Sequence, residues 1–122
     1  MLRAMDALVA TRLAAQGLAG TPAATPHAVV ERLLAVQAQD ARAFRLAIRS
    51  RSVGLAATDV DAALGRRELV VSWLNRGTLH LVAAADLPWL HALTAPRLAT
   101  STARRLRQEG VGPADAERGV RV

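Results

Sequence analysis

The chain has 122 residues, a length typical of one domain with at most a short extension. Hydrophobic residues make up 52% of it, which is enough for a core. Cysteine is absent, which excludes disulfides, a cysteine nucleophile and cysteine-ligated metal centres. Every stretch of about 18 residues contains a charge or a proline, so no membrane span is expected. The N-terminus does not resemble a signal peptide, and we expect a cytoplasmic protein.

The charge balance is basic, with 16 basic and 10 acidic side chains and a net charge of +6. All of the basic residues are arginine. A basic surface suits DNA, because arginine binds phosphate through two parallel hydrogen bonds and neutralised phosphates release counterions. The abundance of alanine and the absence of lysine also fit the coding bias of a GC-rich genome. Charge alone therefore leaves DNA binding and coding bias as alternatives.

The first third of the chain predicts two helices. Apolar side chains recur at helical spacing over residues 2–17, which indicates an amphipathic helix. After a loop that contains glycine and proline, Thr25 and Pro26 mark the start of a second helix. Helical spacing places Val30 on its apolar face and extends that face as far as Gln37.

A third helix is predicted over about residues 40–51, with Asp40 as its N-cap. Phe44 and Ile48 share one face of this helix. Three arginines lie on the opposite face, within about 60° of one another at 100° per residue. They are Arg42, Arg45 and Arg49. We predict that they contact DNA phosphates, the alternative being an ordinary solvated helix face.

The second half of the chain predicts a β-hairpin between helices. A short fourth helix starts at residues 58–61. Residues 69–74 and 78–82 have the alternation and β-branched content of two strands. Asn75-Arg76-Gly77 forms the turn between them. Arg76 at this turn is either a phosphate contact or a solvated turn residue.

Several short helices followed by a hairpin indicate an α+β, mainly helical domain with the layout of a winged helix, a helix-turn-helix plus a β-hairpin wing. Asp86 is expected to cap a fifth helix that Pro96 ends or kinks, and a last helix runs to about Glu109. We therefore predict a winged-helix domain over residues 1–95. Residues 96–122 are a predicted helical extension that leads towards a second domain.

Few residues suggest a metal or a pocket. The histidines, His27, His80 and His91, lie on three different predicted elements without ligand spacing, so neither a metal site nor a cofactor is expected. The larger aromatic residues, Phe44, Trp73 and Trp89, are all expected in the core. An aromatic pocket for a flipped base is therefore not expected.

Two glutamines, Gln37 and Gln39, stand out in the segment after the second helix. Helical spacing places Gln37 on the buried face and Gln39 about 200° away from it. The two amides face the same way only if the helix ends near Gln37 and the chain extends. Spacing alone favours a different arrangement, in which Gln37 bonds a loop backbone group and Gln39 is solvated.

Three sequence motifs together resemble the winged-helix DNA glycosylases, a family that includes enzymes that unhook interstrand crosslinks. The motifs are Leu34-Ala35-Val36-Gln37-Ala38-Gln39-Asp40, Arg51-Ser52-Val53-Gly54-Leu55, and Trp73-Leu74-Asn75-Arg76-Gly77-Thr78-Leu79-His80-Leu81-Val82 followed by Asp86-Leu87. The resemblance extends over roughly residues 10–110. In that family a Gln-x-Gln motif lies in the catalytic centre, which implies a catalytic role for Gln37 and Gln39. The Arg-Gly-Thr-Leu-His run is a second family signature, with a structural or DNA-facing role.

The resemblance implies that the chain binds double-stranded DNA and takes part in hydrolysing the N-glycosidic bond of N7-alkylated purines or crosslinks. A glutamine amide has no usable pKa, so it would hold the attacking water as a fixed dipole. That is weak catalysis, and it suffices when the leaving base is already cationic. Asp40 lies next to the motif as a possible base, although capping the third helix is the role that its position favours.

Family members are much longer and build a concave DNA cradle from tandem winged helices. We therefore expect this chain to be an N-terminal part, active as a monofunctional glycosylase only when the full architecture is completed. The alternatives are a non-enzymatic winged-helix regulator that binds DNA and a remnant without activity.

Overall fold

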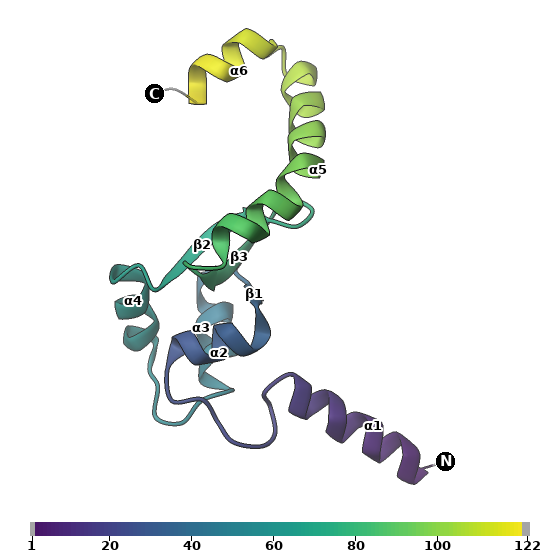
Figure 1. The fold of residues 1–122 in the computed structure, drawn as a ribbon, viewed down its shortest axis with the longest axis vertical. Helices are drawn as coiled ribbons and strands as arrows, with labels where there is room; N and C mark the ends of the chain where they lie inside the picture. Colours follow the sequence, from purple (N-terminus) through teal and green to yellow (C-terminus); the bar gives the residue numbers. More distant parts are fainter. Residues whose placement is uncertain (1, 121–122) are drawn as a thin grey trace.

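A computed structural model describes the backbone of residues 2–120. Its elements in chain order are α1 (Leu2–Ala15), α2 (Pro26–Leu33), β1 (Ala35–Gln37), α3 (Ala41–Arg49), α4 (Ala57–Gly65), β2 (Leu69–Leu74), β3 (Thr78–Ala83), α5 (Leu87–Gln108) and α6 (Pro113–Val120) (Figure 1). Within residues 2–120 these are six helices and one three-stranded sheet. The predicted α+β, mainly helical class is confirmed.

The sheet is antiparallel, with the strand order β1-β3-β2. β3 lies in the middle, and its Leu81 pairs with Val36 of β1 on one side and with Val71 of β2 on the other. The predicted hairpin is confirmed, with strands that match the expected ranges within one residue. Its turn has positive φ at Asn75, Arg76 and Gly77 (30°, 53° and 74°), so the chain reverses through left-handed conformations.

The core lies on both faces of this sheet. On one face α2, α3 and α4 pack on the sheet, and the buried side chains there include Val30 of α2, Ile48 of α3 and Leu81 of β3, each 0% exposed. On the other face Leu90 of α5 packs against Val82 in a smaller cluster. The sheet is therefore an internal layer between the small helical bundle and the start of α5.

The end of α2 differs from the prediction. The helix stops at Leu33, and Leu34 adopts a left-handed φ of 66° that turns the chain into β1. The apolar face therefore does not extend to Gln37 as a helix. Local propensity does not reveal a three-residue strand, because pairing with β3 and burial of Val36 stabilise it through residues far along the chain.

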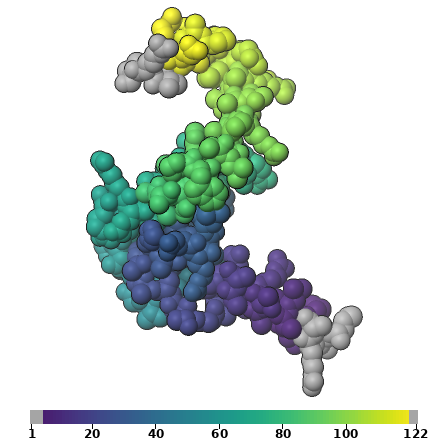
Figure 2. All heavy atoms as spheres, in the orientation of Figure 1, coloured from purple at the N-terminus to yellow at the C-terminus, as the bar shows by residue number. Residues whose placement is uncertain are grey.

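α1 forms as predicted but does not bury an apolar face. Its described side chains, from residue 5 onwards, are all exposed, including Met5 and Leu8 at about 60%. Figures 1 and 2 show the helix projecting from the packed centre at the opposite end from α6. The helical spacing of these apolar residues therefore predicted the helix correctly, but the expectation that it would bury an apolar face was wrong.

α5 continues through Pro96, so the predicted fifth and last helices are one element. The helix changes direction along its length (Figure 1), as a helix does around an internal proline. Asp86 stands at the N-cap position without capping the backbone; its carboxylate instead accepts the Trp89 indole N–H at 2.8 Å. Among the described residues no helix is both long and apolar enough to cross a bilayer.

The division between residues 1–95 and 96–122 stays a prediction. α5 runs across the predicted boundary without interruption, and residues 96–120 contain the second half of α5 and all of α6.

Candidate active site and DNA-facing surface

The Gln-x-Gln segment is extended, and its two glutamines lie on the same side. Burial alternates along it: Val36 and Ala38 are buried, whereas Gln37 and Gln39 are exposed. This period of two is that of a β-strand. The condition for the two amides to face the same way is thus met, because the helix ends before them and the chain extends. The predicted placement of Gln37 on a buried helical face is wrong.

Gln39 completes the edge of the sheet with its side chain. The Ala38 N–H donates to the Leu79 carbonyl at 2.8 Å, and the Leu79 N–H donates to Gln39 Oε1 at 2.6 Å. In a regular antiparallel pair the second bond goes to a backbone carbonyl. Here the amide oxygen of Gln39 takes that place, and its NH₂ group forms no hydrogen bond within the described residues. Of the two glutamines it is Gln39, not Gln37, that bonds backbone, the reverse of what spacing favoured.

Gln37 lies across from a histidine of the middle strand. It pairs with His80 of β3, and His80 pairs in turn with Ser72 of β2. Directly paired residues on neighbouring strands project from the same face. The three polar side chains therefore form one row across the sheet, and Gln39 follows Gln37 by two residues along the same segment.

Asp40 caps α3, as predicted. Its Oδ1 accepts the backbone N–H groups of Arg42 and Ala43 at 2.7 and 3.0 Å. These two bonds, first that from Ala43 and then that from Arg42, lower the pKa of the Asp40 carboxyl from its usual value. The Asp40 carboxylate is therefore occupied in capping the N-terminus of α3. Gln37 and Gln39 remain as the polar side chains of this segment that could bind a water molecule.

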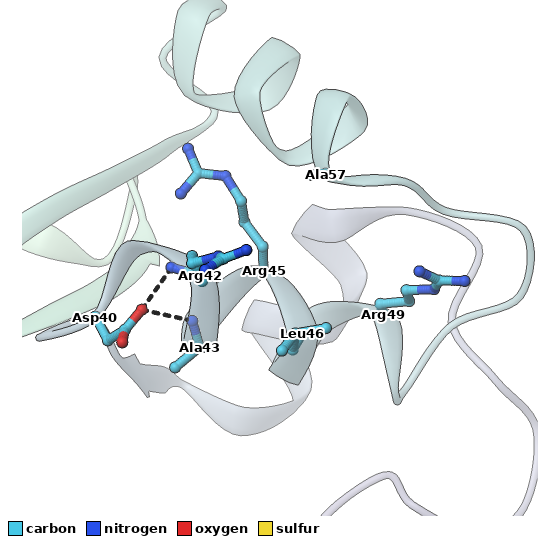
Figure 3. A pocket seen from close by; sticks show the side chains of 7 residues that line it. All are labelled: Asp40, Arg42, Ala43, Arg45, Leu46, Arg49 and Ala57. Carbon is cyan, nitrogen blue, oxygen red and sulfur yellow. Dashed lines mark hydrogen bonds between the residues drawn. The ribbon is translucent and has the colours of Figure 1, made fainter.

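The three predicted arginines of α3 line one open groove that begins at Asp40 (Figure 3). They do not form one cluster of free charges. Arg45 is only 26% exposed, and its Nε donates to Asp61 of α4 at 3.0 Å. In Figure 3 its side chain rises towards α4, whereas that of Arg49 points away from it. Within the described residues, Arg42 and Arg49 form no ion pair.

A second basic groove lies between the hairpin turn and α5. Arg76 lines it from the turn, and Arg97 lines it from α5, together with polar side chains from Asn75, Thr94 and Ser101. No carboxylate is among the lining residues. Sequence reasoning missed Arg97, because the expected break at Pro96 separated it from the hairpin. Had the helix been predicted to continue through Pro96, Arg97 would have been placed on the same helix as Trp89.

The candidate residues gather at one end of the sheet. In the antiparallel register the Gln37 end of β1 lies beside the start of β3, which follows the hairpin turn directly. α3 begins immediately after the glutamine segment. The glutamine segment therefore runs from the strand end beside the Arg76 turn to Asp40, where the α3 groove begins, and the row of Gln37 with His80 lies on the sheet face of α5, opposite α3.

The tryptophans are not core residues, contrary to expectation. Trp73 is 58% exposed and Trp89 is 47% exposed, whereas Phe44 is buried as predicted. Trp73 lines a shallow groove against α5. We expected no aromatic pocket for a flipped base because both tryptophans were expected in the core. That reason is wrong, since both tryptophans are exposed.

Comparison with known proteins gives one finding. A family model described as DNA glycosylase AlkZ-like matches residues 30–122. This span includes the glutamine segment, α3, the hairpin and α5, and it is well over half of the chain. No curated protein and no solved structure matches the chain. The family match is the one that the sequence motifs predicted, and the chain belongs to the AlkZ-like DNA glycosylase family.

Proposed function

We propose that the chain binds double-stranded DNA as a winged helix and supplies Gln37 and Gln39 to hydrolysis of the N-glycosidic bond of an N7-alkylated purine. The observation that carries this proposal is the position of the two exposed amides, which lie on one side of an extended segment at the end of the sheet next to the hairpin turn with Arg76. The family membership supports the glycosylase chemistry.

The order of elements supports the winged-helix assignment. α2, β1, α3, α4 and the β2–β3 hairpin follow one another along the chain, and β3 lies between β1 and β2. In a winged helix two consecutive helices form the helix-turn-helix, and the following hairpin forms the wing. In this assignment α3 and α4 are the helix pair, and the hairpin turn with Arg76 is the tip of the wing.

The two glutamines have different free groups for a water molecule. Gln39 has committed its carbonyl oxygen to the Leu79 N–H, so its NH₂ remains as a donor. Gln37 forms no side-chain hydrogen bond within the described residues, so its carbonyl oxygen remains free to accept from water. The Gln37 carbonyl would thus accept a hydrogen bond from the water, and the Gln39 NH₂ would donate one to a nearby oxygen atom.

The reaction that such a pair can assist has an easy leaving group. As the C1′–N9 bond breaks, its electron pair moves to the base and neutralises the charge of the N7-alkylated purine. The water oxygen bonds to C1′ and loses a proton. Fixed dipoles stabilise the positive charge that develops on the sugar. An uncharged base would need protonation as well, and neither amide supplies a proton at neutral pH.

Arginines on both sides of the glutamines would hold the DNA backbone. Among the residues that the structure describes, Arg42 and Arg49 on the α3 side have no ion-pair partner, and Arg76 and Arg97 share the groove on the hairpin side. Arg45 has a structural role as well, because its ion pair joins α3 to α4. Phosphate contacts of this kind position a protein on DNA without reading sequence.

The test is base release from a labelled duplex that contains one N7-methylguanine, with abasic sites converted to strand breaks by mild alkali. We expect release by the wild type and its loss in Gln37→Ala. Gln108→Ala, which removes an exposed glutamine at the end of α5, is the matched control and should act like the wild type. DNA binding without release by the folded wild type would contradict the glycosylase proposal and favour a non-enzymatic DNA-binding role.

A further inference from the structure

His80 occupies the centre of the polar row that contains Gln37. In the β1–β3 pairing the Ala38–Leu79 rung is hydrogen-bonded, so the neighbouring Gln37–His80 pair is of the non-hydrogen-bonded type. In such a pair the Cα atoms are about 4.5 Å apart and the side chains are closest. The imidazole is therefore the nearest titratable neighbour of Gln37 on β3.

The hydrogen bond of the His80 ring fixes which nitrogen carries the proton. Nδ1 lies 3.0 Å from the Thr78 carbonyl oxygen. A carbonyl only accepts, so Nδ1 is the donor and Nε2 of the neutral ring keeps its lone pair. Nε2 forms no hydrogen bond within the described residues. The ring is half-buried, so this lone pair is both oriented by the backbone and reachable from the surface.

The groups around His80 are mostly uncharged. Gln37 faces it from β1 and Ser72 faces it from β2. α5 packs on the same face of the sheet, and its titratable or charged side chains near the hairpin are His91 and Arg97, which line separate grooves beside Trp73 and Asn75. In this part of the structure no carboxylate pairs with the ring.

We propose that His80 is a further catalytic residue, which removes the proton from the water that Gln37 and Gln39 hold. This inference rests on the proposed glycosylase function. As the water oxygen bonds to C1′, Nε2 takes one water proton, the C1′–N9 bond breaks, and the cationic purine leaves as the neutral base. The amides hold the water but lack a basic pKa, and His80 supplies the base that they lack.

The experiment measures single-turnover base release from the N7-methylguanine duplex as a function of pH. The proteins are the wild type, His80→Gln, His80→Ala and the control His91→Gln, which removes an exposed histidine of α5. We expect both His80 variants to lose release on the order of 10²-fold. We also expect the pH profile of release to differ between the wild type and His80→Gln, because only the wild type has the imidazole base. Added imidazole should restore part of the activity of His80→Ala, which a merely structural role would not permit.

The outcomes separate the two proposals. Release that depends on Gln37 but is unchanged in both His80 variants, with the wild-type pH profile, would overturn the role of His80 and keep the glycosylase function. Loss of release in His80→Ala without rescue by imidazole, together with a lowered melting temperature, would assign His80 to structure only. Absence of release by the folded wild type would overturn both proposals.

Discussion

Replacing Gln39 with alanine is expected to weaken the fold, whereas the same change at Gln37 is not. The Gln39 side chain accepts the Leu79 N–H at 2.6 Å in place of a strand carbonyl. A hydrogen bond contributes about 0.5–1.5 kcal/mol net. The bond is exposed, so the freed N–H regains water, and we expect a loss near the lower end, about 0.5–1 kcal/mol. In a chain of 122 residues each 1 kcal/mol lowers Tm by roughly 4 °C.

Urea unfolding followed by far-UV circular dichroism measures this difference, and amide hydrogen exchange at Leu79 locates it. Gln39→Ala should lower the midpoint without changing the slope and should speed exchange at Leu79. Gln37→Ala is the control and should stay within about 0.5 kcal/mol of the wild type, because the Gln37 side chain forms no hydrogen bond with any residue that the structure describes. Gln39→Glu keeps an acceptor and should retain most of the stability. Equal destabilisation by the two alanine variants, or unchanged exchange at Leu79, would refute the proposed edge bond.

Three further predictions concern the core, the helix cap and the DNA contacts. Ile48→Ala should lower the free energy of unfolding, measured with urea, by about 2–4 kcal/mol because the Ile48 side chain is 0% exposed. Leu46→Ala on the same helix should lower it by less than about 0.5 kcal/mol, because Leu46 is 60% exposed. Similar losses in the two variants would contradict the burial of Ile48 in the core. Because the pKa of Asp40 is lowered in the fold, its contribution is present above the unfolded pKa of about 3.9 and is lost as pH falls through the folded value. The stability gap between the wild type and Asp40→Ala should therefore narrow on acidification, and a constant gap from neutral to acidic pH would argue against the charged cap. Arg76→Ala and Arg97→Ala should each weaken duplex binding and reduce the slope of log affinity against log salt by about 1, and an unchanged slope would remove that arginine from the interface.

The parts of the fold that short-range signals determine were predictable. The turn at Asn75-Arg76-Gly77 located the hairpin, and α2 begins after Thr25, as the sequence predicted, with the Thr25 side chain as its cap. Asp40 likewise caps α3. Each of these features depends on residues within a few positions of one another, so the sequence pattern carries the relevant physics.

The parts that failed depend on distant partners. β1 exists because its three residues pair with residues 80–82, and no local pattern reveals that pairing. The Gln39 bond to Leu79 and the Arg45 pair with Asp61 likewise join separate segments. The two catalytic candidates were found through the family motif, while their different hydrogen-bonding states became visible only in the structure. The ion pair that distinguishes Arg45 from Arg42 and Arg49 was not visible in the sequence for the same reason, and phosphate contact by these three arginines stays a prediction.

The side chains of α4 favour an enzyme that recognises DNA shape over a regulator that reads sequence. Proteins that read bases in the major groove do so mostly with arginine, lysine, asparagine and glutamine. In the proposed helix-turn-helix α4 is the second helix, and it has none of these residues. Its charged residues, Asp59 and Asp61, are both engaged within the fold: Asp59 accepts the Ala56 N–H at 2.7 Å, and Asp61 accepts from Arg45.

Binding to undamaged DNA should therefore be independent of sequence and steeply dependent on salt, since only phosphate contacts remain. Competition among duplexes of equal length and unrelated sequence, at fixed ionic strength, measures this directly. We expect nearly equal affinities. A regulator would instead show one preferred sequence, with a gain of 10³-fold or more that is typical of specific sites. Such a preference would show that base edges are read by residues outside α4 and would return the chain to the class of regulatory DNA-binding proteins.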